Sequence, residues 1–217
     1  MAYPFLPRAS RLTPSDESRF LFPYQVTMPD SPGDNHDLRS DQNDDEGLRI
    51  RGPIPEELFS FYEDRPFKIC TRCGEGLADF TEGYRVSKVY RGEEVIFEYA
   101  LCLPCLRNMF EESSEESKEA LMKFQMERFR FVSGFDECAL CDNTREALPT
   151  MEYGLVGICV GDGLAESNLI CGGCMEAMSE CVSEETRKGW DRFVEDNFPG
   201  VPADFEPMPV RGPVTVM

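Results

Sequence analysis

The sequence of 217 residues predicts an α+β fold in which one small module occurs twice, at residues 53–132 and 133–198. Three observations predict it. CxxC pairs recur 68 or 69 residues apart, β-rich segments lie between the pairs, and apolar residues at helical spacing follow the second pair. The repeat extends beyond cysteine: Tyr84 recurs as Tyr153, and Ser114 with its two following glutamates recurs at Ser183.

The two ends of the chain, residues 1–52 and 199–217, predict disordered tails. Residues 27–46 are almost entirely polar, so burial would not compensate for the entropy lost on ordering them. The C-terminal tail contains five prolines and predicts an extended chain. Residues 20–24 form an aromatic cluster that either lies on the domain surface or acts as a linear binding motif.

A β-hairpin is predicted between the two CxxC pairs of each copy. Residues 84–90 and 95–101 are rich in β-branched and aromatic residues and flank a polar turn. In the second copy, residues 155–160 and 164–170 flank a Gly-Asp-Gly turn, whose glycines permit positive φ angles.

A helix is predicted to begin on the second CxxC pair of each copy. Its spacing in the first copy assigns a core stripe to Leu106, Met109, Phe110, Ala120, Leu121, Phe124 and Met126. Ser114, followed by Glu115 and Glu116, forms a capping box, which predicts that the helix ends and restarts there. The second copy repeats this pattern with a cap at Ser183.

Eight of the ten cysteines lie in the four CxxC pairs, and their spacing predicts metal binding. Two thiolates two residues apart can hold one tetrahedral ion, and a second pair brought alongside by the hairpin completes a four-sulfur site. Tetrahedral all-thiolate coordination favours zinc, with iron as the alternative. A disulfide framework is disfavoured in an intracellular chain, and thioredoxin-type redox pairs would need a βαβ setting.

A CxxC turn, a β-hairpin and a CxxC pair on the first turn of a helix together resemble the treble-clef group of zinc fingers. The resemblance covers about 140 residues and stays at the level of the fold. It implies two zinc ions, one bound by Cys70, Cys73, Cys102 and Cys105, and the other by Cys138, Cys141, Cys171 and Cys174.

The cysteine spacing and acidic composition are also similar to rubredoxins, which hold one iron for electron transfer. The sequence departs from that pattern after the second pair, where Leu106 and Met175 continue into helices instead of a glycine loop. Rubredoxin-like electron transfer is therefore the alternative function.

Three further residues, outside the two predicted ligand sets, are assigned other roles. Arg72 precedes Cys73 and is expected to balance the negative charge that four thiolates leave on a zinc ion. Cys159 and Cys181 lie outside the repeated pattern, and either fill the core or take part in redox or ligand exchange at the second site.

The charge distribution limits the classes of function. The net charge is −19, of which residues 133–198 contribute −10, and this acidity disfavours nucleic-acid binding. A nucleic-acid-binding regulator is therefore only the lesser alternative function. Arg85, Lys88 and Arg91 hint at a basic stripe, but ordinary solvated charges on a hairpin explain them. The sequence predicts a cytoplasmic protein because it shows neither a secretory signal nor a membrane span.

No catalytic constellation is predicted. The single histidine, His36, lies in the polar tail, and no phosphate-binding loop or dinucleotide motif is present. We therefore expect a non-enzymatic adaptor whose acidic surface binds a protein partner with a basic surface. The oligomeric state is left open.

Overall fold

The structure is a computed structural model that describes residues 48–148 and 152–198. Its elements are β1 (Gly52–Pro53), η1 (Glu56–Leu58), η2 (Leu77–Asp79), β2 (Tyr84–Arg91), β3 (Glu94–Cys102), α2 (Leu103–Glu111), α3 (Glu115–Arg128), η3 (Arg145–Ala147), β4 (Glu152–Val160), β5 (Gly163–Cys171), α4 (Gly172–Glu180) and α5 (Glu184–Asn197). Most of both predicted tails, including the aromatic cluster and His36, lies outside the described residues.

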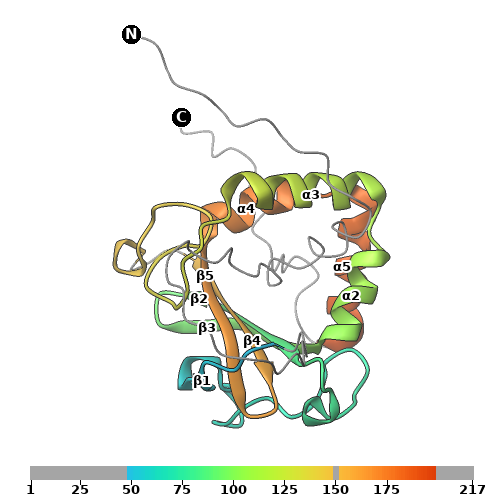
Figure 1. The fold of residues 1–217 in the computed structure, drawn as a ribbon. Helices are drawn as coiled ribbons and strands as arrows, with labels where there is room; N and C mark the ends of the chain where they lie inside the picture. Colours follow the sequence, from blue (N-terminus) through green and yellow to red (C-terminus); the bar gives the residue numbers. More distant parts are fainter. Residues whose placement is uncertain (1–47, 149–151, 199–217) are drawn as a thin grey trace, which may run out of the picture. The chain divides into compact units, whose positions relative to one another are not determined.

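The predicted α+β fold class is confirmed, because both modules contain an antiparallel hairpin followed by two helices (Figure 1). Residues 48–52, placed in the tail by composition, lead into β1 and include its first residue. The predicted break in each helix is also confirmed, since Ser114 caps α3 and Ser183 caps α5.

The two hairpins join into one five-stranded sheet in the order β1-β5-β4-β2-β3. Ser87 of β2 pairs with Val156 of β4, its own counterpart in the second module. Tyr90 pairs with Tyr153, the counterpart of Tyr84, and the two rings stack with centroids 5.3 Å apart. The register therefore relates the two modules by an approximate two-fold axis through the pair Ser87–Val156.

Helix α4 and the short helix η1 contact opposite faces of the sheet. A Cβ on Gly154 would lie 3.1 Å from Met175 Sδ of α4, whereas a Cβ on Gly157 would overlap Leu58 of η1. Residues three apart on a strand point to opposite faces. The absence of a side chain at Gly157 thus leaves room for Leu58, a large apolar residue from the segment before the first CxxC pair.

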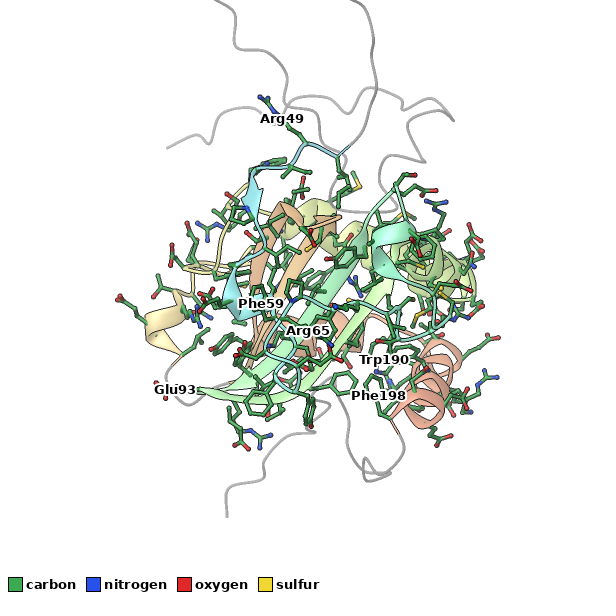
Figure 2. All side chains as sticks on the ribbon, turned by 90° about the horizontal axis from the view of Figure 1, so that it is seen from below. Arg49, Phe59, Arg65, Glu93, Trp190 and Phe198 are labelled. Atoms are coloured by element: carbon green, nitrogen blue, oxygen red, sulfur yellow. The ribbon has the colours of Figure 1, made fainter. Side chains whose placement is uncertain are left out.

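The second helix of module 2 packs on the sheet of module 1. Trp190 and Phe193 of α5 contact Tyr99 of β3 at ring distances of 5.7 and 5.8 Å, and Phe198 contacts Phe97 at 4.7 Å. Figures 1 and 2 both show α5 on the same side of the molecule as α2. The modules are therefore joined by helix packing as well as by the sheet.

The predicted core stripe of the first module is confirmed in part. Leu106 and Phe124 are each 9% exposed, but Met126 is 62% exposed, so its assignment to the core was wrong. Two residues turn a helix by about 200°, so a residue two positions after buried Phe124 faces the opposite side of α3.

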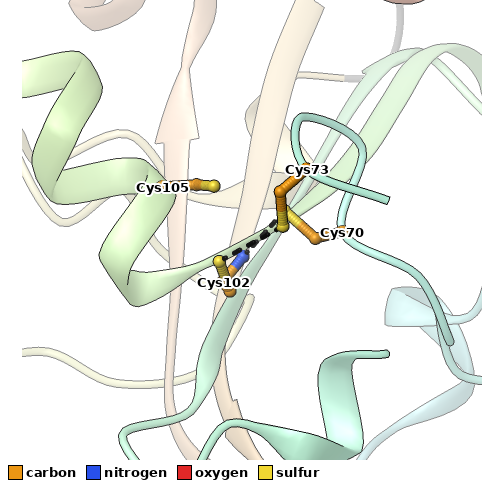
Figure 3. A group of neighbouring side chains, drawn as sticks. All are labelled: Cys70, Cys73, Cys102 and Cys105. Atoms are coloured by element: carbon orange, nitrogen blue, oxygen red, sulfur yellow. Dashed lines mark hydrogen bonds between the residues drawn. The ribbon is translucent and has the colours of Figure 1, made fainter. Parts of the chain in front are cut away.

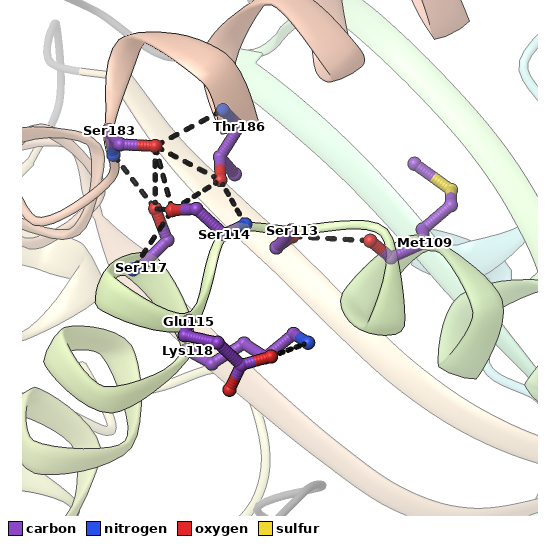
Figure 4. Close-up of polar contacts among 8 residues, drawn as sticks. All are labelled: Met109, Ser113, Ser114, Glu115, Ser117, Lys118, Ser183 and Thr186. Atoms are coloured by element: carbon purple, nitrogen blue, oxygen red, sulfur yellow. Dashed lines mark hydrogen bonds and ion pairs between the residues drawn. The ribbon is translucent and has the colours of Figure 1, made fainter.

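The N-termini of α3 and α5 meet in a cluster of four hydroxyl groups, from Ser114, Ser117, Ser183 and Thr186 (Figure 4). Ser114 Oγ lies 2.8 Å from Ser183 Oγ. Each helix also satisfies a backbone group of the other: the Ser183 N–H donates to Ser117 Oγ at 2.8 Å, and the Ser114 N–H donates to Thr186 Oγ1 at 3.0 Å. These bonds are exchanged symmetrically between the two modules.

Two helix N-termini placed together repel each other, because each carries a partial positive charge. The first turns of both helices contain acidic pairs that offset this charge: Glu115, Glu116, Glu184 and Glu185. The capping-box sequence therefore stabilises the contact between the modules as well as each separate helix.

We expect Ser114→Ala and Ser183→Ala each to lower the free energy of unfolding by about 1 kcal/mol, the usual cost of losing an N-cap. Their effects should not add, since the two hydroxyls bond each other. Chemical denaturation of both single variants and the double variant measures this coupling. Ser113→Ala is the control, because Ser113 Oγ bonds only the Met109 carbonyl in α2 and caps neither helix.

The arm formed by residues 54–65 is held to the sheet by a buried ion pair. Lys88 Nζ and Glu98 Oε2 are 3.2 Å apart, and their side chains are only 4% and 7% exposed. Lys88 also donates to the Phe59 carbonyl, while Glu98 accepts from Ser60 Oγ and from the Phe61 N–H. The interpretation of Lys88 as a solvated hairpin charge is therefore wrong, because the arm covers it.

Candidate metal centres

The four cysteines of module 1 converge where three elements meet. Cys70 and Cys73 lie on the turn before η2, Cys102 ends β3, and Cys105 lies in the first turn of α2 (Figure 3). Their sulfur atoms all lie within 4.8 Å of one another, and Cys73 Sγ is 4.0 Å from Cys102 Sγ. Sulfurs bound at about 2.3 Å to one tetrahedral ion would be slightly closer together.

Module 2 builds the same arrangement from Cys138, Cys141, Cys171 and Cys174, whose sulfurs also lie within 4.8 Å of one another. Cys141 Sγ is 3.5 Å from Cys171 Sγ. The structure thus brings together both sets of cysteines that the sequence grouped. Site 1 is more open, because Cys73 is exposed, whereas three of the four cysteines in site 2 are buried.

The same backbone hydrogen bonds position the first CxxC turn against the strand in both modules. The N–H of Thr71 donates to the Ala100 carbonyl, and the N–H of Ala139 donates to the Leu169 carbonyl, both at 2.8 Å. Gly74, at a φ of +74°, allows the turn after Cys73 to close. Each turn is therefore tied to the strand that ends in the third cysteine of its site.

Backbone N–H groups also point at the sulfur atoms. The Cys102 N–H donates to Cys70 Sγ at 3.4 Å, and the Cys171 N–H donates to Cys138 Sγ at 3.3 Å. Burial opposes ionisation of the Cys70 thiol, but the N–H groups around it prevail and lower its pKa to about 7. These donors favour the thiolate form that binds a metal ion.

Site 2 has a side-chain donor of its own. Asn143 Nδ2 lies 3.5 Å from Cys171 Sγ. Burial raises the pKa of the Cys171 thiol, but the Asn143 amide and neighbouring N–H and thiol groups reverse the effect and lower it. Glu75 occupies the matching position in module 1, so this interaction belongs to site 2.

An arginine lies beside each site and bonds the backbone of the ligand residues. Arg72 Nη1 donates to the Cys105 carbonyl at 3.3 Å, and its Nη2 pairs with Glu112 at 2.7 Å. At site 2, Arg130 Nη1 donates to the carbonyls of Cys141 and Cys138 at 2.6 and 3.3 Å. The sequence indicated Arg72 but missed Arg130, because Arg130 comes from the end of module 1 and only the fold brings it to module 2.

The two remaining cysteines occupy different surroundings. Cys159 is fully buried on β4, and burial raises its thiol pKa to about 12, which disfavours the thiolate form. Cys181 is half-buried at the end of α4, and its Sγ bonds the Ala177 carbonyl at 3.2 Å. The interpretation as a buried core residue thus holds for Cys159, whereas Cys181 remains partly accessible.

The three cations of the first hairpin are engaged with other groups. Lys88 is buried against Glu98, Arg91 pairs with Glu152 at 2.5 Å, and Arg85 bonds the Tyr99 hydroxyl at 3.3 Å. They do not line up as an exposed basic stripe.

Each four-cysteine group can hold one metal ion, since it supplies a complete set of soft ligands at suitable separations. In the described part of the chain, no helix combines the length and apolar character needed to cross a membrane. No protein-family profile, curated protein or solved structure matches this chain at a significant level.

Proposed function

We propose that the chain is a non-enzymatic cytoplasmic adaptor, stabilised by two structural zinc ions, that binds a protein partner through an acidic surface. The observation that carries this proposal is the closed ligand set at both sites. Four sulfurs complete the tetrahedral shell of zinc, and this leaves no position at which a substrate or an activated water would bind.

Zinc rather than iron is the proposed metal. Both sites join the end of a strand to the start of a helix, as a structural zinc site does, and cysteine thiolates hold zinc without redox chemistry. Rubredoxin-like electron transfer is the alternative, and elemental analysis with a visible spectrum separates the two. Two colourless zinc ions per chain support the proposal, whereas iron with a red, bleachable absorbance contradicts it.

The turn at the end of the arm is the proposed contact for the partner. Phe61 and Tyr62 are 67% and 88% exposed, although their rings contact each other at 5.7 Å. Glu98, the acidic member of the buried ion pair, accepts a hydrogen bond from the Phe61 N–H and so holds this turn against the sheet. Glu63 pairs with Arg65 at 2.7 Å, whereas the next residue, Asp64, is an exposed carboxylate. Exposed aromatic side chains beside such a carboxylate suit a partner that has an apolar pocket with a basic rim.

Photo-crosslinking tests this contact directly. A benzophenone amino acid replaces Tyr62 in the full chain, and replaces Phe131, which is 74% exposed, in a matched control. We expect position 62 to crosslink to a specific basic protein that position 131 does not reach. Phe61→Ala with Tyr62→Ala should then weaken binding of that purified protein by about 30-fold or more, and added salt should weaken it further.

Equal crosslinking from both positions, or unchanged affinity of the double variant, would contradict the proposed contact. Binding of duplex DNA or RNA by the purified chain at physiological salt would contradict the proposed class of partner.

A further inference from the structure

The outer edges of β3 and β5 are equivalent under the approximate two-fold axis. Both hairpins have an irregularity at the same place, so Tyr90 pairs with Val95 and its counterpart Cys159 pairs with Leu164. At the cysteine end, both edges receive the same bond from a CxxC turn, at Ala100 and at Leu169. The two edges are therefore built alike from one end to the other.

What pairs with the two edges differs at the hairpin end. β1 pairs with β5 there, with Gly52 opposite Leu164 and Pro53 opposite Gly163, and the Arg51 N–H donates to the Leu164 carbonyl at 2.8 Å. β3 is the last strand on its side of the sheet within the described residues. An edge strand presents unpaired backbone groups that favour the addition of another strand.

The chain contains a second copy of the β1 segment. Residues 50–54 read Ile-Arg-Gly-Pro-Ile, and residues 210–214, in the C-terminal tail, read Val-Arg-Gly-Pro-Val. The two segments share the central Arg-Gly-Pro, and β-branched residues flank it in both. The sequence therefore supplies one such segment for each of the two equivalent edges.

The tail begins close to the edge in question. Phe198, at the end of α5, contacts Phe97 of β3 at 4.7 Å, and Figure 2 shows Phe198 and Glu93 along the same side of the sheet. Val210 lies twelve residue steps after Phe198, and an extended chain of that length spans about 40 Å. From Phe97 to the hairpin end of β3 the distance is only about 10 Å.

The residues at this edge also suit the segment. Ile50 lies over Gly163, where a Cβ would meet it at 2.6 Å, and Glu94 takes the place of that glycine on β3. Val210 takes the place of Ile50 and is one methylene smaller, which leaves room for the Glu94 side chain. Glu94 is also exposed, so its side chain can turn outward. Glu93 and Glu94 place negative charge near the position expected for Arg211.

We propose that residues 210–214 add to the hairpin end of β3 as a sixth strand, antiparallel to it, in the same way that β1 adds to β5. The Arg211 N–H donates to the Val95 carbonyl in this arrangement, as Arg51 does to Leu164. The C-terminal segment thereby closes the second edge of the sheet.

Hydrogen exchange on the full-length metal-bound protein tests the proposal. We expect the Arg211 amide to exchange at least about tenfold more slowly than an unstructured peptide, with the amide of Arg51, directly before β1, as the internal reference. Val210→Asp with Val214→Asp should abolish this protection. The matched control, Val201→Asp with Val216→Asp, changes two valines of the same tail outside the repeated segment and should retain it.

Two results would overturn the proposal. One is free exchange at Arg211 in the unchanged protein. The other is protection that grows with protein concentration, because the segment would then pair with a second copy of the chain and not with its own β3.

Discussion

Removal of both metal ions is expected to unfold the described fold, residues 48–148 and 152–198, as one unit. Each ion would connect a CxxC turn, the end of a strand and the start of a helix, and these short elements bury little surface on their own. Structural zinc contributes about 10–16 kcal/mol to small domains. That contribution is comparable to the total stability of about 5–15 kcal/mol typical of a folded domain.

The measurement is circular dichroism during titration with a strong chelator under reducing conditions. We expect site 1 to lose its metal first, because Cys73 is exposed there and site 2 is more buried. Loss from one site should weaken the other, since β4 pairs with β2 along the whole length of β2. A chain that keeps its spectrum and melting temperature after elemental analysis shows it to be metal-free would refute this prediction.

Variants that lack one cysteine ligand test the contribution of each metal site to stability. Cys70→Ser and Cys138→Ser each remove one ligand, and either should lower the melting temperature of the whole described fold. Cys181→Ser is the matched control, because Cys181 belongs to neither four-sulfur group. Two separate transitions in either variant would show that the modules unfold independently.

Lys88→Met is expected to lower the free energy of unfolding by about 3–5 kcal/mol, because it leaves the carboxylate of Glu98 buried without its cation. The arm should loosen with it, since the Lys88 ammonium group also holds the Phe59 carbonyl. Urea denaturation measures the first effect, and proteolysis within residues 54–65 measures the second.

The exposed pair Arg91–Glu152 supplies the control, because its side chains are 55% and 24% exposed. Arg91→Met should cost less than about 1 kcal/mol. Lys88→Met combined with Glu98→Gln should recover part of the loss, since the remaining amide is neutral. Equal costs for Lys88→Met and Arg91→Met would contradict a buried role for Lys88.

The local parts of this fold were predictable from the sequence. The hairpins, the restart of the helices at Ser114 and Ser183, and the grouping of the cysteines follow from patterns within one module. Such patterns report on neighbours in the chain, and the internal repeat allowed each one to be checked twice.

The parts that were missed depend on contacts between distant segments. The pairing of β2 with β4, the arm over Lys88 and the approach of Arg130 to site 2 each join elements from different parts of the chain. The alternation of a strand does not reveal which strand lies next to it. A lysine on a hairpin has the same sequence signature whether solvent or an arm covers it.

The register through Ser87 and Val156 gives the chain the architecture of a symmetric dimer whose two subunits are covalently linked. Two separate subunits would dissociate on dilution, and their folding would follow second-order kinetics. Linking them makes association intramolecular, so the midpoint of unfolding should not change with protein concentration. Linkage also allows the sequence of each half to change independently. One such difference is Cys181, which occupies in module 2 the position that Glu112 occupies in module 1.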